Sequence, residues 1–171
     1  MRTDIERLAS NILDQLKIAV LPIPVEEIIK KRGVQLKPYD LGDGVSGILI
    51  VENGIGTIGF NPTESEVRKR FTLAHELGHF ELHKRDQLFI DNKKNFILEF
   101  RNQKSSTGEL QKEQDANAFA AALLMPEKIL MGEIQKRHFN LTDDESIKEL
   151  AELFNVSSIA MTYRISNLGL F

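Results

Sequence analysis

Two histidines flank a glutamate in the pentad His75-Glu76-Leu77-Gly78-His79. On a helix, residues four positions apart lie on one face, so both imidazoles can bind one metal ion. Glu76 follows the first histidine and can reach a water molecule held by that ion. Zinc would make this water acidic, and Glu76 would accept its proton. The pentad therefore predicts metal-assisted hydrolysis as well as a metal site.

A third protein ligand is expected, because a catalytic zinc ion takes three protein ligands and one water. Glu113 projects from the same side of a predicted helix as Ala116 and Asn117, three and four residues on. The small Ala116 would leave room for the helix that carries the histidines. Asp115 is the rival ligand, rotated by about 200° from Glu113. The pattern favours Glu113, and Glu109 is expected to be solvated because it lies further from the small-residue face.

The other two histidines are not expected to be ligands. His83 continues the stripe of His75 and His79, but His75 and His83 are about 12 Å apart along a helix axis. All three cannot approach one ion to about 2 Å. We therefore expect His83 to be a buried or second-shell hydrogen-bonding group. His138 follows two basic residues at a predicted helix end and is expected on the surface.

The composition limits which side chains can bind the metal and which classes of protein the chain can belong to. The chain lacks cysteine, so a zinc site must use His and carboxylate ligands, although manganese or iron can occupy such sites as well. A net charge of −3 argues against a general polyanion-binding surface. The N-terminus lacks an apolar signal core, and no long apolar run occurs, so no membrane span is expected and a cytoplasmic location is the default.

The pentad lies in a helical pattern that runs from about Glu64 to His83. Its apolar positions cover much of the circumference, which is typical of a helix that crosses a core. Thr63 and Glu66 have the spacing of a capping box after Pro62. Gly78 costs a helix about 1 kcal/mol relative to Ala, so another element is expected to approach closely there. The apolar positions are Val67, Phe71, Leu73, Ala74, Leu77, Phe80 and Leu82.

Shorter elements precede this helix. Helices are predicted over 5–16 and 25–32, followed by a short strand over 34–37. The segments 48–51 and 55–60 flank Asn53-Gly54, the dipeptide favoured in a type I′ hairpin turn. A plain structural hairpin accounts for these strands, but an exposed edge strand could also hold an extended peptide through backbone hydrogen bonds.

Helices dominate the rest of the chain. Phe89, Ile90, Phe96, Leu98 and Phe100 suggest two extended pieces, and 105–108 indicates a loop. Helices are predicted over 109–124, from 127 to about 137, over 147–154 and from about 157 to 167, the last two with the look of a helix-turn-helix. We therefore expect one α+β domain over 1–171: N-terminal helices at 1–33, a core at 34–126 with a small antiparallel sheet on the active-site helix, and a C-terminal helical subdomain at 127–171.

Longer segments of the chain resemble the ImmA/IrrE family of zinc metallopeptidases. The shared segments are 71–79 around the pentad, the run from Glu113 to Pro126, the hairpin before the pentad, and the closing Arg164-Ile165 with Leu168-Gly169-Leu170. The resemblance implies a zincin-like core with gluzincin-like zinc ligation by His75, His79 and Glu113, and Glu76 as general base. It also implies a protein substrate, a helix-turn-helix repressor of a mobile element or of a stress response, cut at a specific bond.

The chain also departs from some relatives of that family. Some carry an N-terminal DNA-binding domain, and others an additional C-terminal sensor domain, and we expect neither here. The sequence is thus expected to encode a stand-alone peptidase acting on a separately encoded repressor.

Two other functions compete with peptide cleavage. The first is DNA binding by the last two helices, but Arg164 is the only basic residue of the last one, which argues against direct nucleic-acid binding. The second is a zinc-containing protein that binds a repressor without cutting it.

For cleavage, a hydrogen-bond donor to the oxyanion is also needed, and Tyr163, Tyr39 and His138 are the candidates.

Overall fold

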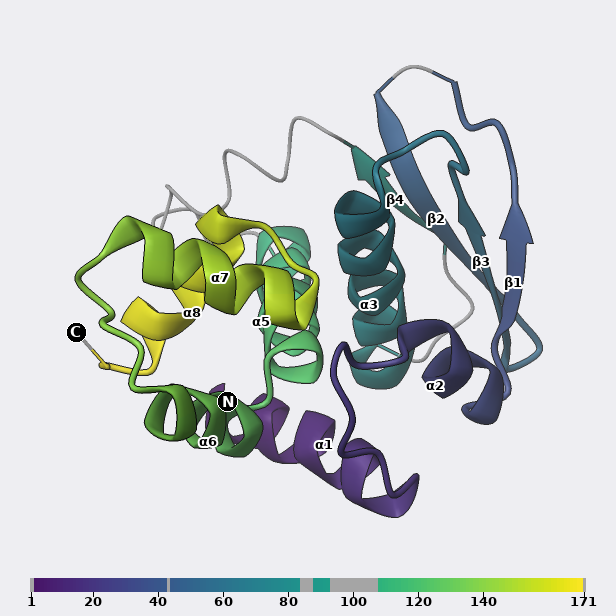
Figure 1. Cartoon of the computed structure of the whole chain (residues 1–171). Coiled ribbons are helices and arrows are strands. Elements are labelled where there is room, and N and C mark those ends of the chain that lie inside the picture. Colours follow the sequence, from purple (N-terminus) through teal and green to yellow (C-terminus); the bar gives the residue numbers. More distant parts are fainter. Residues whose placement is uncertain (1, 43, 84–87, 93–107, 171) are drawn as a thin grey trace.

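A computed structural model describes residues 2–42, 44–83, 88–92 and 108–170. Helix α3 (Glu66–Leu82) lies between a four-stranded sheet on one side and α5 (Gly108–Leu124) on the other, and α1 (Arg2–Gln15) packs across α5 (Figure 1). The short α2 (Val25–Lys31) contacts α3 and β1. Beyond α5 lie α6 (Glu127–Arg137), α7 (Asp144–Phe154) and α8 (Ser158–Asn167). The α+β class is thereby confirmed.

The sheet has the strand order β1-β3-β2-β4. Strands β2 (Val45–Glu52) and β3 (Ile55–Phe60) form the predicted hairpin, and both turn residues, Asn53 and Gly54, have the positive φ that a type I′ turn requires. The sheet is not wholly antiparallel as expected, because β1 (Gln35–Pro38) pairs with β3 in parallel. Strand β3 lies between β1 and β2, so β1 is not the neighbour of the strand that follows it in the sequence.

The first of the two predicted extended pieces contains β4 (Leu88–Asn92), which pairs antiparallel with β2. The second piece, with Phe96, Leu98 and Phe100, lies outside the described residues. Most of the loop predicted at 105–108 does too, and Gly108 already opens α5. Strands β1 and β4 are thus the two edges of the sheet as far as the structure describes it.

Helix α3 crosses the core as its pattern predicts, with every residue from Arg70 to Phe80 buried. Its N-cap differs from the prediction. The Ser65 side chain accepts a hydrogen bond from the Arg68 backbone N–H, whereas Thr63 donates to the Asn61 side chain through its own N–H and hydroxyl. Thr63 is therefore engaged in a turn before the helix, and the helix begins two residues later than expected.

Close packing of α3 on α5 depends on Gly78. A Cβ atom added to Gly78 would lie 3.1 Å from both the Cα and the carbonyl oxygen of Ala116, and 3.1 Å from Phe119 Cδ1. Ala116 is itself fully buried. The prediction that another element approaches the helix at this glycine is confirmed, and the facing small residue is the one that the sequence indicated.

Replacing Gly78 with Ala is expected to destabilise the fold by about 1 kcal/mol. Alanine favours the helix by about 1 kcal/mol, but overpacking against the α5 backbone costs about 1–3 kcal/mol. Gly132→Ala in α6 is the matched control, because no atom lies within 4 Å of its added Cβ, and it should stabilise by about 0.5–1 kcal/mol. Urea denaturation measures both. A Gly78→Ala protein as stable as the wild type would contradict the close-packing argument.

The C-terminal helices are tied to both α1 and α5 by one buried arginine. Arg164 on α8 donates through Nε to the Met125 carbonyl oxygen at 2.9 Å and pairs with the Glu6 carboxylate on α1. Asp143 caps α7 and Ser157 caps α8, since their side chains accept from the backbone N–H groups of Ser146 and Ala160. No helix among the described residues is long and apolar enough to span a membrane.

Candidate metal centre

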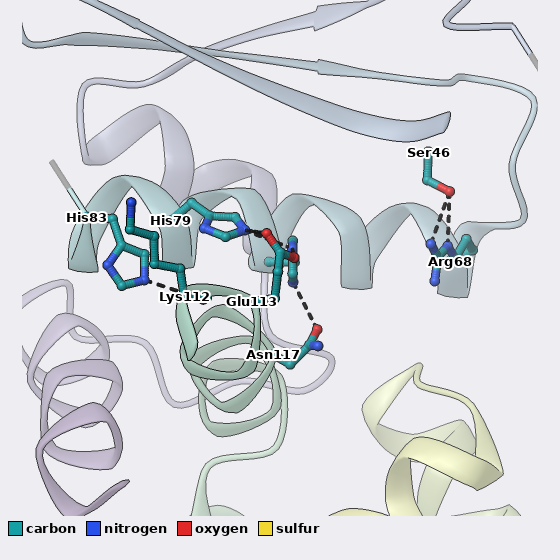
Figure 2. A network of polar contacts seen from close by, with 8 residues as sticks. Ser46, Arg68, His79, His83, Lys112, Glu113 and Asn117 are labelled. Atoms are coloured by element: carbon teal, nitrogen blue, oxygen red, sulfur yellow. Dashed lines mark hydrogen bonds and ion pairs between the residues drawn. The ribbon is translucent and has the colours of Figure 1, made fainter. Parts of the chain in front are cut away.

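His75, His79 and Glu113 lie together where α3 faces α5. The Nε2 atoms of the two histidines are 3.0 Å apart. Glu113 directs one carboxylate oxygen to each ring, Oε2 at 3.2 Å from His75 Nε2 and Oε1 at 3.1 Å from His79 Nε2. Figure 2 shows Glu113 on α5 reaching up to His79 on α3. Three potential ligand side chains from two helices therefore converge on one point.

The spacing of these atoms suits a metal ion. Tetrahedral zinc, with bonds of about 2.0–2.2 Å, places neighbouring ligand atoms roughly 3.3 Å apart. The two histidine nitrogens are 3.0 Å apart, and each lies 3.1–3.2 Å from a different oxygen of Glu113, so a small outward shift of the side chains is enough to match. Two imidazole nitrogens and one carboxylate oxygen are also the donor types that zinc accepts. The residues present thus fit the ion that the sequence predicts.

The protonation states in the cluster also suit metal binding. Burial lowers the pKa of His79, and the charges of His75 and His83 lower it further, against the opposing effect of Glu113. Burial would raise the pKa of Glu113, but hydrogen bonds and charge from His75 and His79 outweigh it and lower the pKa to about 2. The carboxylate is therefore ionised near neutral pH, and His79 favours the neutral ring that a metal requires.

Glu76 lies on the side of α3 that faces the sheet. Its side chain is fully buried. A Cβ added to Gly47 on β2 would lie 3.2 Å from Glu76 Oε1 and 2.3 Å from Thr72 Cγ2, so the strand passes close to the helix here. Glu76 precedes His79 by three residues, which places the two side chains on adjoining parts of the helix surface. The carboxylate is thus enclosed between α3 and β2, on the residue that follows His75 in the sequence.

The rival ligands lie outside the cluster. Asp115 accepts a hydrogen bond of 2.8 Å from Gln111 on the exposed side of α5. His83 Nε2 is 3.3 Å from the Lys112 carbonyl oxygen, so His83 joins the end of α3 to the start of α5, as Figure 2 shows. His138 is exposed in the left-handed conformation at the end of α6. The side chain of Glu109 lies outside the described residues.

The three candidates for oxyanion donor sit on other elements than the cluster. Tyr39 follows edge strand β1 and is 67% exposed. Tyr163 is half-buried on α8, and His138 ends α6. The assignment of a donor among them stays a prediction.

Two residues near the cluster were not assigned a role from the sequence. Asn117 directs its side-chain oxygen to His75 Nδ1 at 2.9 Å. The signal for it was present, since Asn117 stands four residues after Glu113 and so on the same face of α5. The second such residue is Gly47 on β2. A glycine inside a strand is a sign that another part of the molecule approaches the backbone closely.

The chain shows clear similarity to known proteins. Residues 29–166 match the peptidase family described as the IrrE N-terminal-like domain. Metallopeptidase ImmA of Bacillus subtilis (strain 168) is 26% identical over 147 residues, which are 86% of this chain and 78% of that protein. A solved structure of a Mycobacterium tuberculosis transcriptional regulator superposes with a TM-score of 0.65 at 16% identity, over 96% of this chain and 46% of the regulator. This last likeness concerns the fold alone, and the chain spans less than half of the regulator.

Proposed function

The chain belongs to the IrrE N-terminal-like family of metallopeptidases, and we propose that it is a zinc-dependent endopeptidase that cleaves one regulatory protein. The observation that carries the proposal is the convergence of His75, His79 and Glu113, whose ligand atoms all lie within 4.8 Å of one another. In this proposal these three residues hold the ion within a zincin-like core. Glu76, next to them, is the general base.

The roles of the chain's own side chains follow from their positions. A zinc ion bound by the three ligands would act as a Lewis acid on the scissile carbonyl and would acidify water. Glu76 accepts a proton from the attacking water and passes it to the leaving amine. Its burial restricts the carboxylate, since β2 passes so close that a Cβ added to Gly47 would lie 3.2 Å from Glu76 Oε1. One of Tyr163, Tyr39 and His138 donates to the oxyanion in this scheme.

The proposed substrate is a helix-turn-helix repressor of a mobile element or of a stress response, and the proposed location is the cytoplasm. The support for the substrate is the family resemblance. Direct binding to DNA through the helix-turn-helix-like pair α7 and α8 is disfavoured, because Arg164 on α8 is only 3% exposed and pairs with Glu6, and the exposed Lys148 on α7 pairs with Glu145. Phosphate contacts that dominate DNA affinity would need exposed cations.

We further propose that the chain acts as one domain, with N-terminal helices at 1–33, a peptidase core at 34–126 and a C-terminal helical subdomain at 127–171. The support is the Arg164 cluster, in which α8, α1 and the Met125 carbonyl at the end of α5 meet. These contacts join the last of the three parts to the first part and to the core.

Incubation with a repressor encoded beside this gene tests the proposal. Zinc-loaded protein is expected to cut the repressor at one peptide bond and so to release two fragments. A chelator is expected to stop the reaction. Mass spectrometry of the fragments identifies the bond. An intact repressor recovered in a stable complex with the zinc-loaded protein would instead favour sequestration without cleavage.

A further inference from the structure

The side chain of Asn117 contacts the proposed ligand His75 at the ring nitrogen that faces away from the cluster. Its Oδ1 atom lies 2.9 Å from His75 Nδ1, on the side of the ring opposite the nitrogen that joins the cluster. Asn117 and Glu113 are one turn apart on α5, so one helix face contacts His75 at both ring nitrogens. Figure 2 shows Asn117 below Glu113 on the same helix.

This contact bears on which nitrogen of His75 carries the proton. An amide oxygen can only accept a hydrogen bond, so the contact requires a proton on Nδ1, whereas a proton on Nε2 would be donated to Glu113 Oε2 at 3.2 Å, and the shorter distance, 2.9 Å, is the one to Asn117. The lone pair is then on Nε2, which points at His79 Nε2 and Glu113 Oε2. In the opposite tautomer, a hydrogen atom on Nε2 would occupy the place where the ion binds. The tautomer that donates to Asn117 is therefore the one that can bind a metal.

We propose that Asn117 is a positioning residue that fixes His75 in the Nδ1-protonated tautomer and thereby sets the affinity of the site for zinc. The inference rests on the proposed function. A ligating histidine commonly donates its second N–H to a carboxylate or a carbonyl, and losing that partner typically weakens metal binding about 10- to 100-fold. Here the partner is a neutral amide, in a site that already contains the carboxylates of Glu113 and Glu76.

Three variants test the role of the acceptor. Asn117→Leu keeps the approximate size but removes the acceptor, and should weaken zinc binding about 10- to 100-fold. Asn117→Asp keeps an oxygen acceptor and adds negative charge, and should bind zinc at least as tightly as the wild type. Gln111→Leu, an exposed position on the same helix, is the control and should leave the affinity unchanged. Competition with a chromophoric chelator measures all four proteins.

The tautomer itself is measured by ¹⁵N NMR of the imidazole rings in the metal-free wild type and in Asn117→Leu. We expect the Nδ1-protonated form of His75 in the wild type, and its loss in Asn117→Leu. Nε2-protonated His75 in the wild type, donating to Glu113, would overturn the proposal. So would an unchanged zinc affinity in Asn117→Leu.

Failure of the proposed function gives a different result. A wild-type protein that binds no zinc would overturn the proposed zinc site, while the tautomer of His75 would still report on the contact with Asn117. Wild-type zinc binding that Asn117→Leu leaves intact would overturn only the role of Asn117. Circular dichroism of each variant shows whether it is folded. If Asn117→Leu is unfolded, the zinc affinity of Asn117→Asp and the NMR spectrum of the wild type still test the proposal.

Discussion

Replacing Glu76 with Gln is expected to leave zinc bound and to slow peptide cleavage by about 100- to 10 000-fold, the usual contribution of a general base. Glutamine has nearly the size of glutamate, so it fills the same enclosed space beside Gly47 and Thr72. It cannot accept a proton from the attacking water. The proposed ligands His75, His79 and Glu113 are untouched, so the zinc content should stay at that of the wild type.

Two measurements separate these effects. Metal analysis of the purified variant gives the zinc content, and the rate of repressor cleavage gives the activity. Glu66→Gln, an exposed glutamate in the first turn of the same helix, is the matched control and should cleave like the wild type. If Glu76→Gln cleaves at the wild-type rate, Glu76 is not the base. If it loses zinc, its role is in holding the site together.

The parts of this molecule that could be predicted from sequence are those governed by local rules. The helical spacing of His75 and His79 brings their rings together once the helix forms, and Asn53-Gly54 specifies its turn without help from the rest of the chain. The position of Glu113 depends on how two helices pack. The sequence still indicated it, because Gly78 and Ala116 are small residues at the point of closest approach.

The features that could not be predicted are those for which two residues or two strands are equally suitable by local rules. Thr63 and Ser65 can both cap a helix, and only the turn formed by Asn61 decides between them. Parallel pairing of β1 with β3 depends on the path of the chain around the sheet. The close approach of β2 at Gly47 to Glu76 likewise requires knowing which strand lies over α3. Each of these is set by tertiary packing rather than by the residue's own preference.

His79→Ala and Glu113→Ala are each expected to abolish the stabilisation that zinc gives the folded protein. Free zinc at 100 times its Kd stabilises a protein that binds it only when folded by about 2.7 kcal/mol. For a chain of this length, that corresponds to a rise in Tm of roughly 5–10 °C. Removing either side chain leaves two of the three proposed ligands, and the rise should disappear.

Comparing each protein with and without zinc isolates metal binding from damage to the core. His79 is nearly fully buried, so His79→Ala lowers the Tm even of the metal-free protein by leaving a cavity. The change in Tm that zinc causes within one variant does not include the loss of Tm caused by the cavity. Asp115→Ala on the same helix as Glu113 should keep the full rise, since Asp115 pairs with Gln111 rather than with the histidines. A rise lost in Asp115→Ala but kept in Glu113→Ala would reverse the choice of third ligand.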